Sequence, residues 1–248
     1  MNEVVRSVAL SPEQLAVVMN GEWFSALEPA FQRAVLASSR VIVLTAGKPV
    51  FRRGDPNDGI YGVISGVVCF GAVAPSGRES IVGLAEASQW FGEIALFDDG
   101  QRTHDAWADV SSTLLHLPLR RLTKILANDP LAWRQLGRLM VRKFRIALSL
   151  WEDLALEAPR VRLARCLINL FEGYGERKAE PPTRLRVSQE RLGMMLSLSR
   201  QTINELLRQM EQESIIQCQR GGLRILNPAR LRDAARGSSQ STAFAICN

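Results

Sequence analysis

The sequence of 248 residues predicts an α+β protein, with a β-rich domain first, one long helix next and a basic helical domain last. Three observations predict this order. Short β-forming runs fill residues 40–119, a helical apolar repeat fills 129–157, and two short capped helices with a hairpin pattern fill 185–227. Many short strands at regular spacing are typical of a sandwich or barrel.

The composition is that of a globular protein. Hydrophobic residues make up 46% of the chain and charged residues 23%, so we expect a packed core rather than disorder. The chain has no apolar run of about 18 residues, and its first residues have no apolar stretch behind a basic start. We therefore expect a cytoplasmic protein that is not bound to a membrane.

The four cysteines predict no metal site. Cys69, Cys166, Cys218 and Cys247 are separated by roughly 30 residues or more and form no C-x-x-C pair. This spacing argues against a zinc ribbon or a local cysteine cluster. We expect reduced and mostly buried thiols.

The positive charge is concentrated in the last third of the chain. Residues 160–248 contain 15 Lys and Arg against 8 Asp and Glu, and residues 1–159 contain 16 against 17. A basic domain beside a nearly neutral one is typical of a protein that binds a polyanion such as nucleic acid.

Helices are predicted before the β-rich region. Residues 11–39 have helical spacing, with Ser11 as N-cap, Pro12 at the first helical position and Glu13 in the first turn. From Arg40 onward, β-forming runs alternate with turn residues such as those at 53–56, 65–66 and 75–77. The six runs are Val41–Leu44, Pro49–Phe51, Ile60–Ile64, Val67–Val73, Ser80–Leu84 and Ser112–Leu117.

A long helix is predicted from Asp129-Pro130 to about Glu157. Apolar residues recur along it at alternating steps of four and three, which is the spacing of a coiled-coil seam. The seam residues are Met140, Phe144, Ala147, Trp151 and Leu154. This pattern predicts a parallel homodimer, and packing against the chain's own β-rich domain remains the alternative. Pro159 predicts a break, which we interpret as a domain boundary or hinge. The loop at 176–183 and the tail at 237–248 carry no regular pattern.

Two helices joined by a three-residue turn predict a helix-turn-helix. Ser188 caps a helix over Gln189–Leu196, and Ser199 caps a second helix that begins at Arg200. Ile203, Leu206, Leu207 and Met210 form the inward face of the second helix, and Gly193 allows a close approach. The outward residues are Arg200, Gln201, Asn204 and Arg208. Arg matches guanine edges, and Gln and Asn match adenine edges.

A basic hairpin follows and predicts a wing. Residues 215–218 and 223–226 flank a turn that contains Arg220, and Arg224 follows on the second strand. Arginines there can contact phosphates, which positions the domain without reading sequence. We count Ser188, Gln189 and Ser199 with the DNA-binding residues. The alternative is a helical hairpin with a solvated polar face, but the combined pattern predicts a sequence-specific regulator that binds double-stranded DNA.

The sequence resembles the Crp/Fnr family, the relatives of the cyclic-AMP receptor protein, from about residue 24 to 228. Two motifs carry the resemblance: LSRQTINELLRQMEQESII, and WFGEIALFDDGQRT at Trp90–Thr103, which we call the cassette. The resemblance implies an N-terminal β-roll, a jelly roll like that of cyclic-nucleotide-binding domains, at 24–128. It further implies a dimerisation helix at 129–158 and a winged helix-turn-helix at 159–230.

The resemblance also assigns effector-binding roles within the cassette. Gly92 would let the backbone approach a ligand, and Glu93 would accept a hydrogen bond from a ribose hydroxyl. Arg102 would pair with the phosphate of a cyclic nucleotide such as cyclic AMP, and Thr103 would donate to a phosphate oxygen. If the protein is an activator, the resemblance implies RNA polymerase as a further partner.

Several departures leave the effector open. Ala147 and Leu148 stand where cyclic-AMP receptors carry a Thr-Ser pair for adenine, His104-Asp105 follows Thr103, and Glu205 replaces a common Arg. The barrel therefore senses a cyclic nucleotide, senses another small molecule or binds no ligand. Glu93 and Arg102 forming only an internal ion pair is a further alternative.

Other classes are less well supported. An iron–sulfur sensor would need an N-terminal cysteine cluster, and haem would have only His104, His116 and Cys69 as axial candidates. A nucleotide-sensing module that does not bind DNA is argued against by the outward face of the second helix. We predict no catalytic residues, because the chain has no Walker loop, metal motif or evident nucleophile near the cassette. We expect effector binding to reorient the long helices at 157–160.

Overall fold

The computed structural model describes residues 10–73, 79–175 and 184–237. The chain forms two compact units, the first ending at Phe144 and the second beginning at Arg145. The predicted turn at 75–77, the loop at 176–183, Cys247 and the tail beyond Gly237 lie outside the described residues.

Three short helices open the first unit: α1 (Pro12–Met19), α2 (Glu22–Ser25) and α3 (Pro29–Ser38). The predicted cap of α1 is present as a capping box. The Ser11 hydroxyl accepts from the Gln14 amide at 3.2 Å, and the Gln14 side chain accepts from the Ser11 amide at 3.1 Å. These two bonds satisfy backbone donors that a helix start leaves free.

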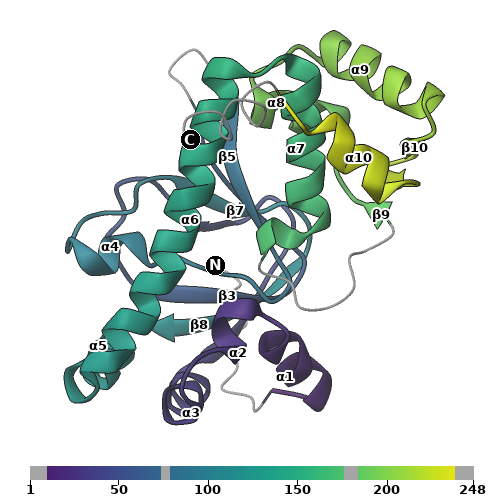
Figure 1. Cartoon of the computed structure of the whole chain (residues 1–248). Helices are drawn as coiled ribbons and strands as arrows, with labels where there is room; N and C mark the ends of the chain where they lie inside the picture. The colour runs from purple at the N-terminus through teal and green to yellow at the C-terminus, as the bar shows by residue number, and fades with distance from the viewer. Residues whose placement is uncertain (1–9, 74–78, 176–183, 238–248) are drawn as a thin grey trace, which may run out of the picture. The chain divides into compact units, whose positions relative to one another are not determined.

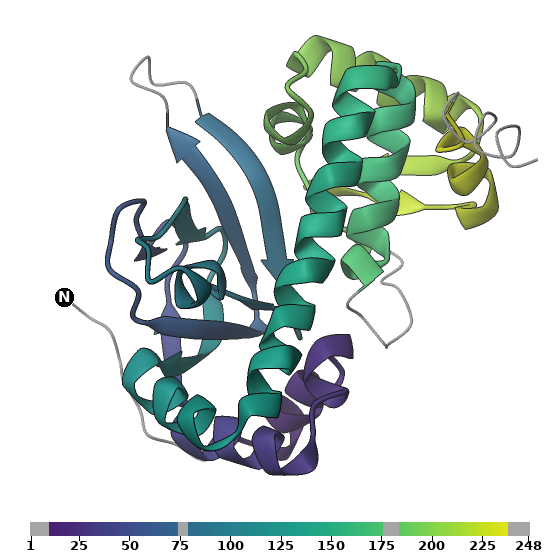
Figure 2. The same ribbon diagram turned by 60° about the vertical axis from the view of Figure 1, so that its left-hand side comes forward.

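Two four-stranded antiparallel sheets form the β-roll, with the orders β1-β8-β3-β6 and β2-β7-β4-β5. The strands are β1 (Arg40–Leu44), β2 (Pro49–Phe51), β3 (Gly59–Ser65), β4 (Val67–Val73), β5 (Glu79–Glu86), β6 (Trp90–Phe91), β7 (Asp105–Ala108) and β8 (Ser112–Pro118). The sequence predicted six of them and missed β6 and β7, which have only two and four residues. Figure 2 shows β4 and β5 as a long curved pair.

The first sheet is buried on both faces. Along β3, Tyr61 and Val63 belong to the core between the two sheets, whereas Ile60 and Ile64 belong to the core that also includes residues of α1–α3. Successive strand residues point to opposite faces, so a sheet covered on both sides requires apolar residues at consecutive positions. This explains why β3 reads as a continuous apolar run.

Three helices complete the first unit: α4 (Ile94–Phe97), α5 (Leu119–Asn128) and the first part of α6 (Pro130–Leu156). The predicted long helix corresponds to α6, which Figure 1 shows as one continuous helix. The Trp23 indole donates to the Gln135 carbonyl at 2.7 Å, and this bond fastens the N-terminal helices to α6.

The second unit is a helical domain with a small sheet. After α6 come α7 (Pro159–Phe171), the short helix η1 (Gly173–Gly175), α8 (Gln189–Leu196), α9 (Arg200–Gln212) and α10 (Pro228–Ala234). The strands β9 (Arg184–Leu185), β10 (Ile216–Gln219) and β11 (Gly222–Ile225) pair in the order β10-β11-β9. The predicted break between helices is confirmed, because α6 ends at Leu156 and Pro159 is the first residue of α7. The two compact units divide within α6, between Phe144 and Arg145. The sequence missed β9 and α10.

Candidate effector and DNA-binding sites

Arg102 is the central residue of the cassette, and its guanidinium is buried inside the β-roll. Its Nη1 donates to the Gly92 carbonyl at 2.7 Å, and its Nη2 donates to the Gly59 carbonyl at 2.7 Å. Nη2 also forms an ion pair with the Asp58 carboxylate. The cation is therefore neutralised by the chain itself.

Aromatic rings cover the Arg102 guanidinium. Its central carbon lies 4.2 Å from the centre of the Phe51 ring and 5.9 Å from that of Tyr61, so cation–π attraction adds to the ion pair. The Nε atom is buried and has no hydrogen-bond partner among the described residues. One strong donor of Arg102 is left for a ligand.

Gly92 is required beside Arg102. Its φ of +93° is a conformation that L side chains rarely adopt, and an added Cβ would lie 2.9 Å from Arg102 Nη1. We predicted that this glycine frees the backbone for a ligand. In the structure its space is filled by the arginine, and its carbonyl accepts from that arginine.

Glu93 is buried and pairs with the long helix. Lys143 Nζ lies 3.0 Å from Glu93 Oε2 and donates to the Trp90 carbonyl at 2.6 Å. The alternative of an internal Glu93–Arg102 ion pair is wrong, because each residue has a different charged partner. Lys143 was missed by the sequence analysis, since a lysine on a long amphipathic helix carries no local signal.

Thr103 is exposed at the end of the cassette. Its hydroxyl lies 3.0 Å from His104 Nδ1, and its carbonyl accepts from Arg53 Nε at 2.8 Å. The Asp105 carboxylate accepts from the Arg53 amide at 2.8 Å. Burial and the Arg53 charge lower the pKa of His104, so the imidazole favours its neutral form.

A polar network links Arg102 through Asp58 to Tyr61 on β3 and His116 on β8. Asp58 accepts from the Tyr61 hydroxyl as well as from Arg102. His116 Nε2 donates to the Asp58 carbonyl at 3.1 Å, and His116 Nδ1 accepts from Arg40 Nε at 3.1 Å. Burial lowers the pKa of His116. Both of its ring nitrogens are engaged, which leaves neither for a haem iron.

The helix-turn-helix is held by the predicted caps. The Ser188 hydroxyl accepts from the Arg191 amide at 3.1 Å, and the Ser199 hydroxyl accepts from the Thr202 amide at 3.0 Å. An added Cβ at Gly193 would lie 2.8 Å from the Leu198 carbonyl oxygen. Glycine therefore lets the turn close against α8, whereas the sequence predicted a close approach of the second helix.

Helix α9 has one buried and one outward face. Ile203, Leu207 and Met210 are buried, whereas Leu206 is only half-buried. The outward residues are Arg200, Gln201 and Arg208, which are exposed, and Asn204, which is half-buried. The Gln201 amide donates to the Glu205 carboxylate at 3.1 Å, and base reading by Gln201 would have to break this bond.

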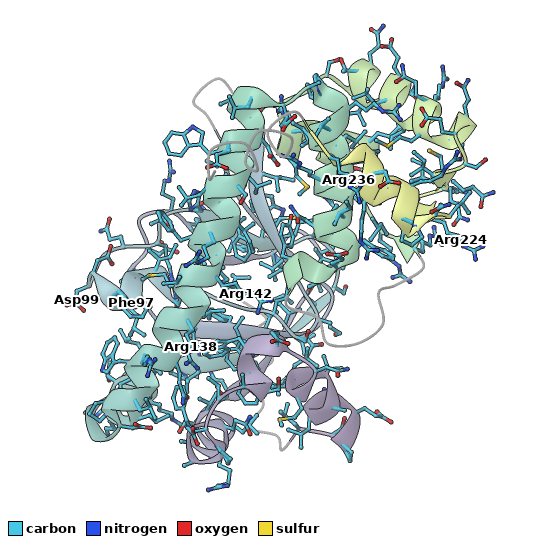
Figure 3. The ribbon with its side chains drawn as sticks, in the orientation of Figure 1. Phe97, Asp99, Arg138, Arg142, Arg224 and Arg236 are labelled. Atoms are coloured by element: carbon cyan, nitrogen blue, oxygen red, sulfur yellow. The ribbon has the colours of Figure 1, made fainter. Side chains whose placement is uncertain are left out.

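The wing is the hairpin of β10 and β11. Arg220 is exposed at its tip, and Arg224 on β11, labelled in Figure 3, is paired in register with Arg184 on β9. Arg184 also donates to the Arg220 carbonyl at 2.6 Å. Like charges facing each other are destabilising unless an anion lies between them. Arg184, which the sequence analysis missed, therefore belongs with the candidate phosphate contacts.

A hollow of about 360 Å³ lies between the start of α8, the start of α9 and the wing. Its lining includes Ser188, Gln189, Arg200, Gln219 and Gly221. Three of the predicted DNA-binding residues thus meet at one place, where the capped N-terminus of α8 favours an anion.

The predicted seam of α6 is largely exposed. Trp151 is 72% exposed and Phe144 60%, and Ala147 and Leu154 are exposed as well, whereas Met140 is half-buried. Val141 and Leu148 add exposed apolar surface beside them. Large apolar side chains in solvent along one helix are typical of an interaction surface.

Two models of known domain families match this chain. The cyclic nucleotide-binding domain model matches residues 41–129, and the Crp-like helix-turn-helix domain model matches residues 161–234. The chain belongs to the Crp/Fnr family. It is a Crp/Fnr-type transcription regulator with a cyclic-nucleotide-binding-type domain and a DNA-binding helix-turn-helix.

Relatives span nearly the whole chain. The "CRP-like cAMP-activated global transcriptional regulator" of Mycobacterium tuberculosis (strain ATCC 25618 / H37Rv) is 29% identical over 217 residues, covering 86% of this chain and 96% of that relative. The "Transcriptional activator protein Anr" of Pseudomonas protegens is 27% identical over 234 residues, covering 94% and 93%. FixK2 from Bradyrhizobium japonicum matches the fold with a TM-score of 0.72 at 17% identity, covering 81% and 98%.

Within the ranges that the structure describes, no helix is both long and apolar enough to cross a membrane.

Proposed function

We propose that this Crp/Fnr regulator binds DNA as a homodimer, reads base edges with α9 and responds to an anionic effector at Arg102. The DNA-reading part is carried by the outward face of α9, where Arg200, Gln201 and Arg208 are exposed next to a capped helix start. Ser188, Gln189, Ser199, Arg220 and Arg224 then contact phosphates and set the register of the domain on DNA.

The base-reading role is tested by comparing two arginines. Arg200→Ala should weaken binding to the operator roughly 10-fold to 100-fold and leave non-specific binding nearly unchanged. Arg224→Ala should weaken both and lower the salt dependence by about one phosphate contact. Arg120→Ala, an exposed arginine on α5 in the first unit, is the control. Equal losses on operator and random DNA for Arg200→Ala would refute base reading.

The homodimer is proposed through the seam of α6. A parallel pair would cover Phe144, Trp151 and Leu154. Phe144 is exposed within the first unit, which also contains the β-roll, and this supports the role. RNA polymerase is a further proposed partner if the protein activates transcription.

The effector is proposed to be a cyclic nucleotide whose phosphate replaces Asp58 at Arg102. Asp58 is half-exposed and can be hydrated when it is released, and the buried Nε of Arg102 offers one more donor. Glu93 and Thr103 would then hold ribose and phosphate oxygens. The relative from Mycobacterium tuberculosis is described as cAMP-activated, which makes cyclic AMP the first ligand to test.

Calorimetric titration with cyclic AMP decides between two candidate functions. Binding that Arg102→Ala abolishes and Asp58→Asn strengthens would support the cyclic-nucleotide sensor. The second candidate is a barrel that binds another small molecule or none, and it is favoured by the complete engagement of Arg102 Nη2 within the chain. No heat from protein that still binds DNA would select it. Nucleotide turnover by the pure protein would contradict both.

A further inference from the structure

The cassette helix α4 leaves apolar side chains in solvent. Ile94 and Phe97 on α4 are exposed, and so is Trp133 at the start of α6. The Phe97 and Trp133 rings meet edge to face, with 5.6 Å between their centroids. Together these three residues form one apolar surface that joins α4 to α6.

This surface continues the seam of α6. Counting back from Phe144 and Met140 in steps of four and three leads to Gly137 and then to Trp133. An added Cβ at Gly137 would meet no atom within 4 Å, so the helix surface is open there. The heptad register therefore runs on to Trp133, and Phe97 extends the apolar strip sideways onto α4.

The register also tells on which side of α6 the cassette helix lies. With Gly137 and Phe144 as a positions, Lys143 is a g position, and it contacts Glu93 and the Trp90 carbonyl next to α4. In a parallel pair of helices, the g side of one faces the e side of the other. The cassette helix of one protomer would thus face the e side of the partner's α6.

The charges on these two surfaces are complementary. Asp98 and Asp99 directly follow α4 and are exposed, while Arg134 at an e position and Arg138 beside it are exposed on α6. Figure 3 labels Phe97, Asp99 and Arg138. Among the described residues of one protomer, no ion pair joins either aspartate to either arginine. A second copy of the chain would supply the missing partners.

We propose that α4 is part of the dimer interface, with Phe97 against the partner's α6 and Asp98–Asp99 facing the partner's Arg138. This inference rests on the proposed parallel dimer. It gives α4 contacts on two sides, with the Arg102 site on one and the partner on the other. Effector binding and subunit association are then linked, because each changes the free energy of the other.

Sedimentation of the full-length chain tests the apolar part. Phe97→Ala is expected to raise the dimer dissociation constant about tenfold or more. Leu15→Ala, an equally exposed apolar residue on α1, is expected to leave it unchanged. A dimer that Trp151→Ala dissociates and Phe97→Ala does not would overturn the role of α4 alone. A wild-type chain that is monomeric at every concentration would overturn the proposed dimer and this inference with it.

A charge-reversal mixture tests whether the contact is between subunits. Asp99→Lys and Arg138→Glu should each weaken their own homodimer, because each places like charges in contact. In a heterodimer of the two variants, both contacts are attractive, so native mass spectrometry of an equimolar mixture should show mostly heterodimer. The double variant should dimerise like the wild type. A statistical mixture with half heterodimer would overturn the inference, even if the double variant is restored.

Discussion

Each unit contains an arginine that holds carboxylates, buried Arg102 in the first and half-buried Arg165 in the second, and the partners of these arginines differ in access to water. Arg165 on α7 pairs with Asp153 and Glu157 near the end of α6, and both acidic side chains are nearly buried. Arg102 in the cassette pairs with Asp58, whose side chain is 48% exposed. Both cations are also bonded to backbone carbonyls, Arg165 to that of Ala235 at 2.9 Å.

This difference separates a structural ion pair from an exchangeable one. A buried carboxylate is destabilising without its cation, because an unpaired charge that is shielded from water costs several kcal/mol of stability, about 3–5 kcal/mol when one partner is removed. A half-exposed carboxylate can return to water at little cost. Arg165 therefore acts as a fixed clamp, and Arg102 can trade its partner for a ligand anion.

The clamp bears on the hinge that the sequence suggested at 157–160. Arg165 follows this segment on α7 and bonds to Asp153 and Glu157, which lie before or within it. An added Cβ at Gly237 would collide with the Glu157 carboxylate, so the chain after α10 also packs there. A pivot at 157–160 would have to break these contacts, and the contacts argue against it.

The largest expected effect is at the clamp. Arg165→Met should lower the free energy of unfolding by roughly 3–5 kcal/mol, because two buried acids lose their cation. Arg232→Met is the matched control in the same unit, since Arg232 pairs with Glu172 at the surface, and it should cost less than about 1 kcal/mol. Urea titration measures both. Equal losses would remove the distinction between buried and exposed pairs.

A smaller effect is expected at Gly92, beside the exchangeable arginine. Gly92→Ala should cost roughly 1–3 kcal/mol, because a positive φ is strained for alanine and the new Cβ crowds Arg102. Gly47→Ala isolates the strain, since φ there is +78° and no atom lies within 4 Å of an added Cβ. If Gly47→Ala costs as much as Gly92→Ala in the same urea titration, crowding of the arginine contributes nothing.

The network behind Asp58 predicts a dependence of stability on pH. Burial lowers the pKa of His116 in the folded protein, so the unfolded chain binds this proton more readily. The free energy of unfolding should therefore decrease as the pH falls below about 6.5, the ordinary value for histidine. His116→Gln should flatten the decrease measured by urea titration between pH 7 and 5. An unchanged slope would show that His116 titrates alike in both states. The pKa of His104 is also lowered, so His104→Gln should flatten the same decrease in the free energy of unfolding, measured in the same way.

Local features were predictable from the sequence, and distant partners were not. The caps Ser188 and Ser199 act on amides three residues away, so their pattern is visible in a short window. Arg102 was assigned by resemblance, but its partner Asp58 lies 44 residues away and depends on the pairing of strands. Lys143 and Glu93 are 50 residues apart in the sequence, and their contact depends on how α6 packs beside the cassette. The fold class followed from periodicity, whereas the charges around the cassette followed from tertiary structure.

The smallest effect on stability is expected at Asp58, and it is the most informative for function. Asp58→Asn should lower the free energy of unfolding by only about 1 kcal/mol, because the Asn amide oxygen can still accept from Arg102, and two backbone carbonyls and the Phe51 ring continue to stabilise the cation. The same change leaves the buried guanidinium of Arg102 without its counter-charge, so its affinity for a phosphate anion should rise. Calorimetry with cyclic AMP on wild type and Asp58→Asn measures this, and Asp109→Asn, an acid directly after β7, serves as the control. A large loss of stability without any gain in anion affinity would place Asp58 with the clamp acids rather than with the exchangeable ones.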